Sequence, residues 1–288
     1  MASGTPEVIG FFHEPTFSIA YIAADPATKK AAIIDPVLDY DEKAGRVSTE
    51  FADKLLAEVK SRGFDVVWIL DTHPHADHFS AAAYLKDKLG APTAIGEHVV
   101  GVQKLWTGFY NLTGFPTDGS QWDRLFADGD TFKVGDIDAR VMFSPGHTLA
   151  SITYVIGDAA FVHDTLFQPD FGSARADFPG GDAAQLYRSI KAILALPDET
   201  RLFTGHDYMP GGRPVAWEST VAEQKASNIH FKDDPDEATF VERRTSRDKT
   251  LPMPKLILHA LQVNMRGGRL PEPEDNGRSY LKIPIGVL

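Results

Sequence analysis

The chain carries the stretch VVWILDTHPHADH from Val66 to His78. Its first five residues are apolar without a break, which is the pattern of a strand buried on both faces of a sheet. Three histidines and an aspartate follow within the last six residues of the stretch. Because His73 and His75 are two residues apart, an extended backbone presents both imidazoles on the same side. The spacing predicts a metal site where this strand ends.

Asp77 and His78 stand just before a helix that we expect over roughly Ser80 to Leu89, with Gly90 as its end. Asp77 has a second interpretation as the N-cap of that helix, since its carboxylate can accept a free backbone N–H. A single histidine of this run could equally lie on the surface. The cluster as a whole favours a metal, because such spacing rarely arises without one.

Three later segments each place a metal-capable side chain at the end of a predicted strand. They are Ser144-Pro145-Gly146-His147-Thr148, Val162-His163-Asp164-Thr165 and Thr204-Gly205-His206-Asp207. Sheets of α/β proteins build their sites at strand ends, so His147, Asp164 and His206 complete a ligand set. Alternation along the strand turns His163 away from Asp164, which indicates a packing role for His163. The histidines without companions nearby are interpreted as packing or surface residues: His13, His98, His230 and His259.

The rest of the chain alternates short strands with single helices, which predicts a layered α/β body. Strands are expected over residues 8–37, 131–134, 138–143, 151–156, 160–163 and 201–203, and helices over residues 49–62 and 182–196. Beyond Gly212, two polar helical stretches at 217–229 and 235–247 precede residues 255–264 and a proline-rich end. We expect a catalytic domain over residues 1–212 and an appendix over residues 213–288, packed on that domain or on a dimer partner.

Composition limits the possible partners of the protein. The 288 residues include 29 Lys and Arg against 40 Asp and Glu, a formal charge of −11. This sign disfavours nucleic acid and anionic membranes. There is no cysteine, which excludes thiolate ligands and disulfides. The sequence shows neither a targeting segment nor a membrane span, so we expect a cytoplasmic protein, and we expect a homodimer.

The succession H-x-H-x-D-H, G-H, D and H resembles the metallo-β-lactamase fold superfamily between about Val8 and Tyr208. The resemblance implies a four-layer αββα sandwich, of class α/β, with the metal at one edge between two sheets. The segment QPDFGSARADFPGG after Asp164, together with His206-Asp207-Tyr208, is similar to the persulfide dioxygenase branch, which is related to glyoxalase II.

That branch implies one Fe(II) per subunit on His73, His147 and Asp164. His75, Asp77, His78 and His206 would then lie around the iron or form a vacant second site. The implied reaction oxidises glutathione persulfide with O2 to sulfite and glutathione. Two imidazoles and one carboxylate also suit non-haem iron on chemical grounds, because they leave coordination positions open.

Two alternatives stay open at this point. All seven ligand positions are present, so a hydrolase with two Zn(II), of the glyoxalase II or lactonase type, uses nearly the same residues. A non-catalytic protein that binds or senses persulfides is the second alternative.

Substrate contacts are expected from four residues outside the ligand set: Arg175, Tyr208, Arg247 and Lys249. Arg175 can clamp a substrate carboxylate with its planar fork, or it can simply pair with Asp177. Arg247 and Lys249 partly match a C-terminal R-x-x-K of glyoxalase-type relatives, although a solvated helical face is also typical of such a run. The aromatic residues between Trp106 and Trp122 could line the pocket or a dimer contact, but core packing is favoured.

Overall fold

The computed structural model describes residues 4–288 and contains two large sheets and one small one. The first sheet has the order β1-β2-β3-β6-β8-β9. Its strands are β1 (Glu7–His13), β2 (Ser18–Ala24), β3 (Lys30–Ile34), β6 (Asp65–Leu70), β8 (Thr93–Gly96) and β9 (Arg124–Phe126). Strand β6 is the apolar run that precedes the histidine cluster. It lies between β3 and β8 and is parallel to both, and Val66, Ile69 and Leu70 are buried while Val67 and Trp68 are half-buried.

The second sheet has the order β10-β11-β12-β13-β14-β15. Its strands are β10 (Thr131–Val134), β11 (Ile137–Phe143), β12 (Ile152–Ile156), β13 (Ala159–His163), β14 (Arg201–Thr204) and β15 (Glu218–Thr220). A small sheet pairs β4 (Val37–Asp41) with β5 (Arg46–Ser48) and β7 (Phe79–Ser80). Strands β13 and β14 are parallel, so Asp164 and His206 follow strands that end at the same edge.

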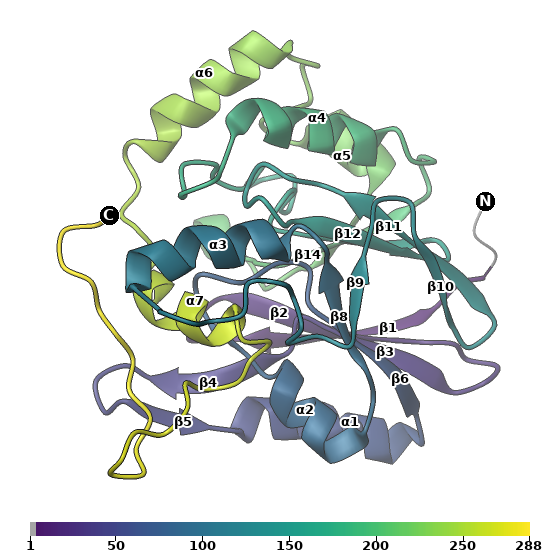
Figure 1. Cartoon of the computed structure of the whole chain (residues 1–288). Coiled ribbons are helices and arrows are strands. Elements are labelled where there is room, and N and C mark those ends of the chain that lie inside the picture. The colour runs from purple at the N-terminus through teal and green to yellow at the C-terminus, as the bar shows by residue number, and fades with distance from the viewer. Residues whose placement is uncertain (1–3) are drawn as a thin grey trace.

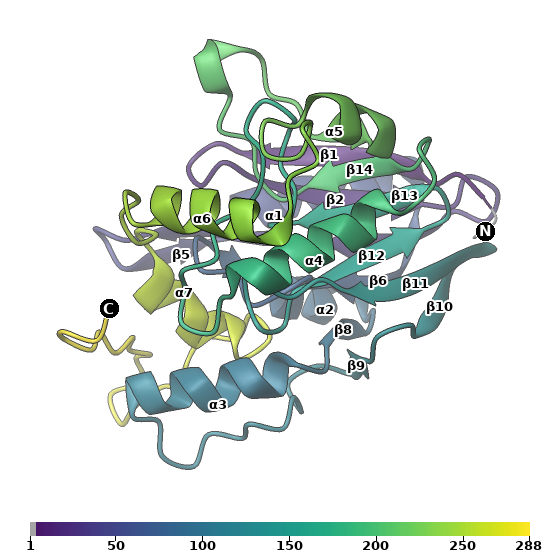
Figure 2. The same cartoon turned by 90° about the horizontal axis from the view of Figure 1, so that it is seen from above.

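Helices cover the outer faces of both sheets (Figures 1 and 2). Helices α1 (Glu50–Arg62) and α2 (Ala82–Leu89) pack on the first sheet. Helices α4 (Ala183–Leu194) and α6 (Glu237–Asp248) share an apolar cluster with the second sheet, beside α5 (Val221–Ser227). Between the sheets lies a third cluster that includes Ile34, Leu70 and Tyr154. The predicted αββα sandwich is thereby confirmed.

Two local features differ from what the sequence led us to expect. Residues 99–110 form helix α3 (Val99–Tyr110), which was not predicted because Gly101 and Gly108 interrupt the pattern. Trp106 and Tyr110 of this helix are buried in an apolar cluster, so core packing does explain the aromatic run. The helix expected from Trp217 begins only at Val221, because residues 218–220 pair with β14 as an edge strand.

The segment after residue 212 lies against the rest of the chain. Following the single turn η1 (Pro210–Gly212), α6 packs on α4, and α7 (Ile257–Asn264) lies beside α3 and β7. The remaining residues run as an extended strip, drawn yellow in Figure 1, that Gln262 holds through Lys282. Within residues 4–288, the helices are too short or too polar to cross a bilayer.

Candidate metal centre

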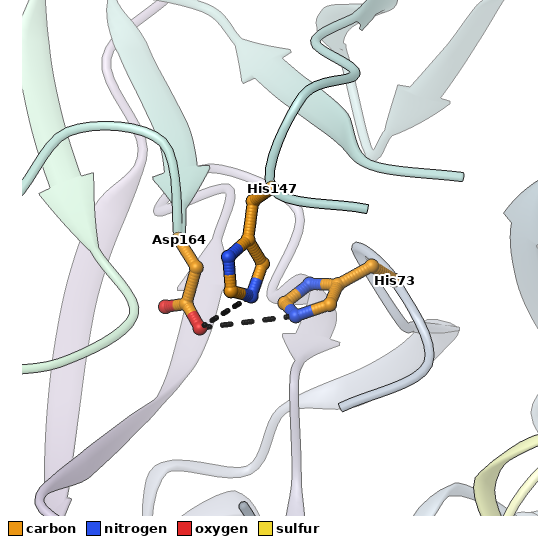
Figure 3. Close-up of side chains that lie close together, drawn as sticks. All are labelled: His73, His147 and Asp164. Carbon is orange, nitrogen blue, oxygen red and sulfur yellow. Dashed lines mark ion pairs between the residues drawn. The ribbon is translucent and has the colours of Figure 1, made fainter. Parts of the chain in front are cut away.

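Three chain segments bring His73, His147 and Asp164 together at the sheet edge (Figure 3). His73 follows β6, His147 lies in the loop after β11, and Asp164 directly follows β13. The Oδ2 atom of Asp164 is 3.5 Å from Nε2 of His147 and 3.8 Å from Nε2 of His73. All three side chains are buried. These are the three residues that the resemblance to the persulfide dioxygenase branch implies as iron ligands.

Hydrogen bonds set the tautomers of both histidines. Nδ1 of His147 lies 2.9 Å from the carbonyl oxygen of Arg175, which can only accept, so Nδ1 carries the proton. The Thr72 hydroxyl donates to Asp35 over 2.8 Å and therefore accepts from Nδ1 of His73 over 3.0 Å. Both Nε2 atoms thus direct lone pairs toward Asp164. Such outer partners are typical of metal-binding histidines.

The charge state of these three groups suits a cation. Burial, followed by the nearby His75, holds the pKa of His73 well below its usual range, and burial lowers the pKa of His147. Burial, the largest single influence, would raise the pKa of Asp164, but His206 and His147 together outweigh it and lower that pKa. Among the described residues, Nε2 of His73 and Oδ1 of Asp164 have no hydrogen-bond partner. Buried lone pairs without a donor are costly unless a cation binds them, so the residues fit a metal.

The other four predicted residues lie directly beside this triad. Nε2 of His206 is 3.3 Å from Oδ2 of Asp164 and 3.4 Å from Oδ2 of Asp77, and Nδ1 of His78 is 2.9 Å from the same Asp77 atom. Asp77, Asp164 and His206 can offer ligand atoms that all lie within 4.8 Å of one another. His75 is turned toward Asp35, with Nε2 2.9 Å from Oδ1. Burial opposes the charged imidazole of His75, but Asp35 outweighs it and raises the pKa to about 9.

The sequence reading missed three residues that shape the centre. Asp35, at the end of β3, accepts hydrogen bonds from Thr72 and His75. Asn264, the last residue of α7, donates to the carbonyls of His75 and His78 and accepts from the N–H of Ser80, each over 2.7 Å. Gly205 leaves room for the ligand carboxylate, since a Cβ there would lie 2.5 Å from Oδ1 of Asp164. Only Asp35 offered a sequence signal, as a charged residue at the end of the predicted β-rich run from Ala31 to Asp35.

A cavity of about 1250 Å³ opens onto the centre and is lined by His147, Asp164 and His206 among others. One wall is aromatic and contains Phe17, Phe167, Phe171 and Tyr208. The Tyr208 ring stacks on His206 with 5.5 Å between centroids and 7° between planes. This volume exceeds what one metal ion requires and is large enough for a peptide-sized substrate.

The three cationic side chains predicted to contact substrate differ in whether they line the cavity and in whether they already have a partner. The Arg175 guanidinium lines the cavity but forms a two-point ion pair with Asp177, at 2.7 and 2.8 Å, and donates to the carbonyl of Pro252. Arg247 is exposed on the cavity wall, and no carboxylate within residues 4–288 pairs with it. Lys249 is exposed and lies outside the cavity lining. His230, interpreted from sequence as lacking companions, accepts from Ser173 beside the cavity.

Comparison with known proteins agrees with this geometry. The chain is 67% identical to the "Beta-lactamase hydrolase-like protein" of Xylella fastidiosa over 99% of its own length, and it spans 66% of the length of that relative. It is 49% identical to "Glyoxylase B2" of Dictyostelium discoideum, covering 93% of this chain and 92% of that one. It is 28% identical to the human mitochondrial "Persulfide dioxygenase ETHE1", covering 92% and 91%.

Among solved structures, ETHE1 from Myxococcus xanthus superposes with a TM-score of 0.73 at 30% identity, covering 91% of this chain and all of that one. The family model described as "Metallo-beta-lactamase superfamily" matches residues 15–206, which contain all seven candidate ligands. The chain therefore belongs to the metallo-β-lactamase superfamily.

Proposed function

We propose that this protein is a non-haem Fe(II)-dependent persulfide dioxygenase that oxidises glutathione persulfide with O2 to sulfite and glutathione. The observation that carries the proposal is the His73, His147 and Asp164 triad. Two neutral imidazoles direct Nε2 lone pairs at one carboxylate, and both Nδ1 protons are engaged by other groups. This is the ligand type of non-haem iron oxygenases. The likeness to proteins named ETHE1 supports the same reading.

Iron held by the triad would supply the redox chemistry at the coordination positions that the three ligands leave open. The chain supplies positioning and shelter around it. The carbonyl of Arg175 and the hydroxyl of Thr72 fix the two imidazoles, so both ligands are preorganised. The ring of Tyr208, stacked on His206, and the neighbouring Phe171 form an aromatic wall of the cavity against which the substrate would be positioned.

A binuclear zinc hydrolase is the second candidate function. Its specific support is the second donor group, in which Asp77, Asp164 and His206 can offer ligand atoms within 4.8 Å of one another. The relative named "Glyoxylase B2" also favours it. For this function, Asp164 would belong to both donor groups, and water instead of O2 would be the second substrate.

One measurement separates the two functions. Protein prepared without oxygen and loaded with one Fe(II) per chain should take up O2 and release sulfite when glutathione persulfide is added. Two bound Zn(II) with hydrolysis of S-lactoylglutathione, and no oxygen uptake with the persulfide, would select the hydrolase. Persulfide binding with no turnover in either assay would select a sensor protein.

Substrate affinity should depend on Arg247. Its guanidinium faces the cavity without a carboxylate partner among the described residues, whereas that of Arg175 is already paired. Loss of a charged contact to a glutathione carboxylate costs about 1.5–3 kcal/mol, so Arg247→Ala should raise KM roughly ten- to a hundredfold. Lys249→Ala is the matched control, since that charge lies outside the cavity lining. Equal effects of the two substitutions in steady-state kinetics would rule out a specific contact by Arg247.

A further inference from the structure

The carbonyl group that orients His147 belongs to the loop of residues 165–181, which connects β13 to α4. Nδ1 of His147 donates to the carbonyl oxygen of Arg175 over 2.9 Å. Phe178 of the same loop packs on the imidazole, with 5.0 Å between the ring centroids. The orientation of this ligand ring therefore depends on where the loop lies.

Helix α6 holds this loop through a buried ion pair. Asp248 is the last residue of α6 and Arg244 lies one turn before it, and they are 2% and 5% exposed. Nε and Nη2 of Arg244 lie 2.9 and 2.6 Å from Oδ1 of Asp248. Oδ2 of Asp248 accepts from the N–H of Ala176 over 2.9 Å. Nη1 of Arg244 donates to the carbonyl of Ser173 over 3.0 Å. The pair thus holds the loop on both sides of Arg175.

One planar peptide group joins Asp248 to His147. The N–H of Ala176 and the C=O of Arg175 belong to the same peptide bond. Because a trans peptide bond is planar, these two groups share one plane and point in opposite directions. Asp248 binds the N–H end, and His147 binds the C=O end. A fixed N–H therefore fixes the direction in which the carbonyl points.

Stability alone does not account for an ion pair at this place. Apolar side chains of similar volume usually stabilise a folded protein as well as a buried ion pair does, or better. Helix α6 already has an apolar anchor in Phe240, which is 1% exposed within the cluster that α4 and α6 share. Apolar residues in place of the pair would, however, leave the N–H of Ala176 and the carbonyl of Ser173 without these partners. The charges therefore serve the loop more than the helix.

We propose that Asp248 is a positioning residue for the metal ligand His147, that it acts through the peptide group between Arg175 and Ala176, and that Arg244 holds it in place. The fixed carbonyl keeps the proton on Nδ1 of His147 and leaves the Nε2 lone pair for the metal. The carboxylate on the N–H also makes the carbonyl a stronger acceptor, because hydrogen bonds in a series polarise one another.

The proposal rests on the metal centre that both candidate functions share, and it deepens both without depending on the choice of metal. Asp248 lies outside the cavity lining, so its effect is on the ligand and not on the substrate. The triad itself comes from residues before 212. The segment after residue 212 thereby contributes to the metal centre through α6.

The test removes the ion pair without leaving one charge alone in the interior. Arg244→Met with Asp248→Leu replaces both side chains by apolar ones of similar volume. Arg244→Gln with Asp248→Asn is the conservative variant, since an amide oxygen can still accept from Ala176. Arg188→Met with Glu237→Leu is the matched control, because it removes an exposed ion pair between α4 and α6.

Three measurements on the full chain, all without substrate, compare these variants with the wild type. ¹⁵N NMR of the metal-free protein, at a pH where His147 is neutral, shows which ring nitrogen carries the proton. Titration with Co(II), whose visible absorption reports its ligands, gives the metal affinity. Circular dichroism gives the thermal transition. A merely structural role for the pair would change the thermal transition but not the tautomer of a folded protein.

We expect the wild type and the control to carry the proton of His147 on Nδ1. In Arg244→Met with Asp248→Leu, a second form with the proton on Nε2 should appear. Co(II) affinity should fall roughly tenfold, at the low end of the effect of residues that contact a metal-binding histidine directly. The thermal transition should stay near that of the wild type. The conservative variant should restore both the tautomer and the affinity.

Three outcomes would overturn the proposal. They are a wild-type tautomer and Co(II) affinity in the apolar variant, an equal loss in the control, and a loss that the conservative variant does not restore. Should the apolar variant not fold, Arg244→Ala with Asp248→Ala replaces it, because smaller side chains leave room for water. If the wild type shows neither candidate activity, the proposed function fails, whereas the tautomer and the Co(II) affinity still judge the role of Asp248.

Discussion

Replacing Asp164 with alanine should abolish metal binding and activity while leaving a folded protein. The carboxylate faces Nε2 of His73, His147 and His206 at 3.3–3.8 Å. Its removal leaves the Nε2 atoms of His73 and His147 without the carboxylate that completes the triad. The loss of metal affinity should exceed the roughly ten- to hundredfold typical of residues that only support a ligand. Metal content by elemental analysis, and the thermal transition by circular dichroism, check the two halves of this result.

Asp164→Asn separates charge from shape in the same experiment. The amide fills the same space, so a structural role for the side chain would survive the substitution. A role as metal ligand would not, because the neutral amide is a much weaker ligand than the carboxylate. Full metal content in Asp164→Ala would show that the centre is elsewhere and would reject the triad.

Asn264→Leu should unfold the metal loop, the segment of residues 71–78 that follows β6. Asn264 is far from this loop in the sequence but contacts it directly in the fold. The Asn264 amide satisfies three backbone groups, those of His75, His78 and Ser80, and it is 2% exposed. Leucine fills a similar volume but leaves these groups without partners, each at a cost of about 1–3 kcal/mol. We expect the free energy of unfolding to fall by several kcal/mol in urea titrations, together with a loss of bound metal.

Gln262→Leu is the matched control on the same helix. Gln262 is 1% exposed and also makes three hydrogen bonds to backbone groups, but these belong to Leu258 and Lys282 instead of the metal loop. This variant should release the extended strip at the chain end and retain the metal. If both variants bind metal as the wild type does, the Asn264 contacts do not support the centre.

Much of the metal centre could be predicted because its residues lie in short sequence motifs at the ends of strands. An apolar run followed by H-x-H-x-D-H specifies both a buried strand and the loop at its end. His147, Asp164 and His206 each come directly after or close to a strand of their own. Since parallel strands carry their loops to the same edge, these short patterns were enough to bring the seven residues together.

What could not be predicted depends on partners far apart in the sequence. Asn264 lies 189 and 186 residues from His75 and His78, and nothing around it marks it as their partner. His13 and Asp39, whose side chains meet at 3.2 Å, are 26 residues apart and lie on strands of different sheets. The ion pair of Arg175 with Asp177 is local, but sequence alone could not decide between it and a substrate contact. Helix α3 was missed since its burial against α7 outweighs its two glycines.

The Asn264 contact also sets an order of events during protein synthesis. A ribosome adds 186 residues between His78 and Asn264, which at about 5–20 residues per second takes roughly 10–40 s. Throughout that interval the nascent metal loop lacks the amide that holds its backbone. The loop can take its final form only after Asn264 has been synthesised and has left the ribosome, so stable metal insertion is expected after that point.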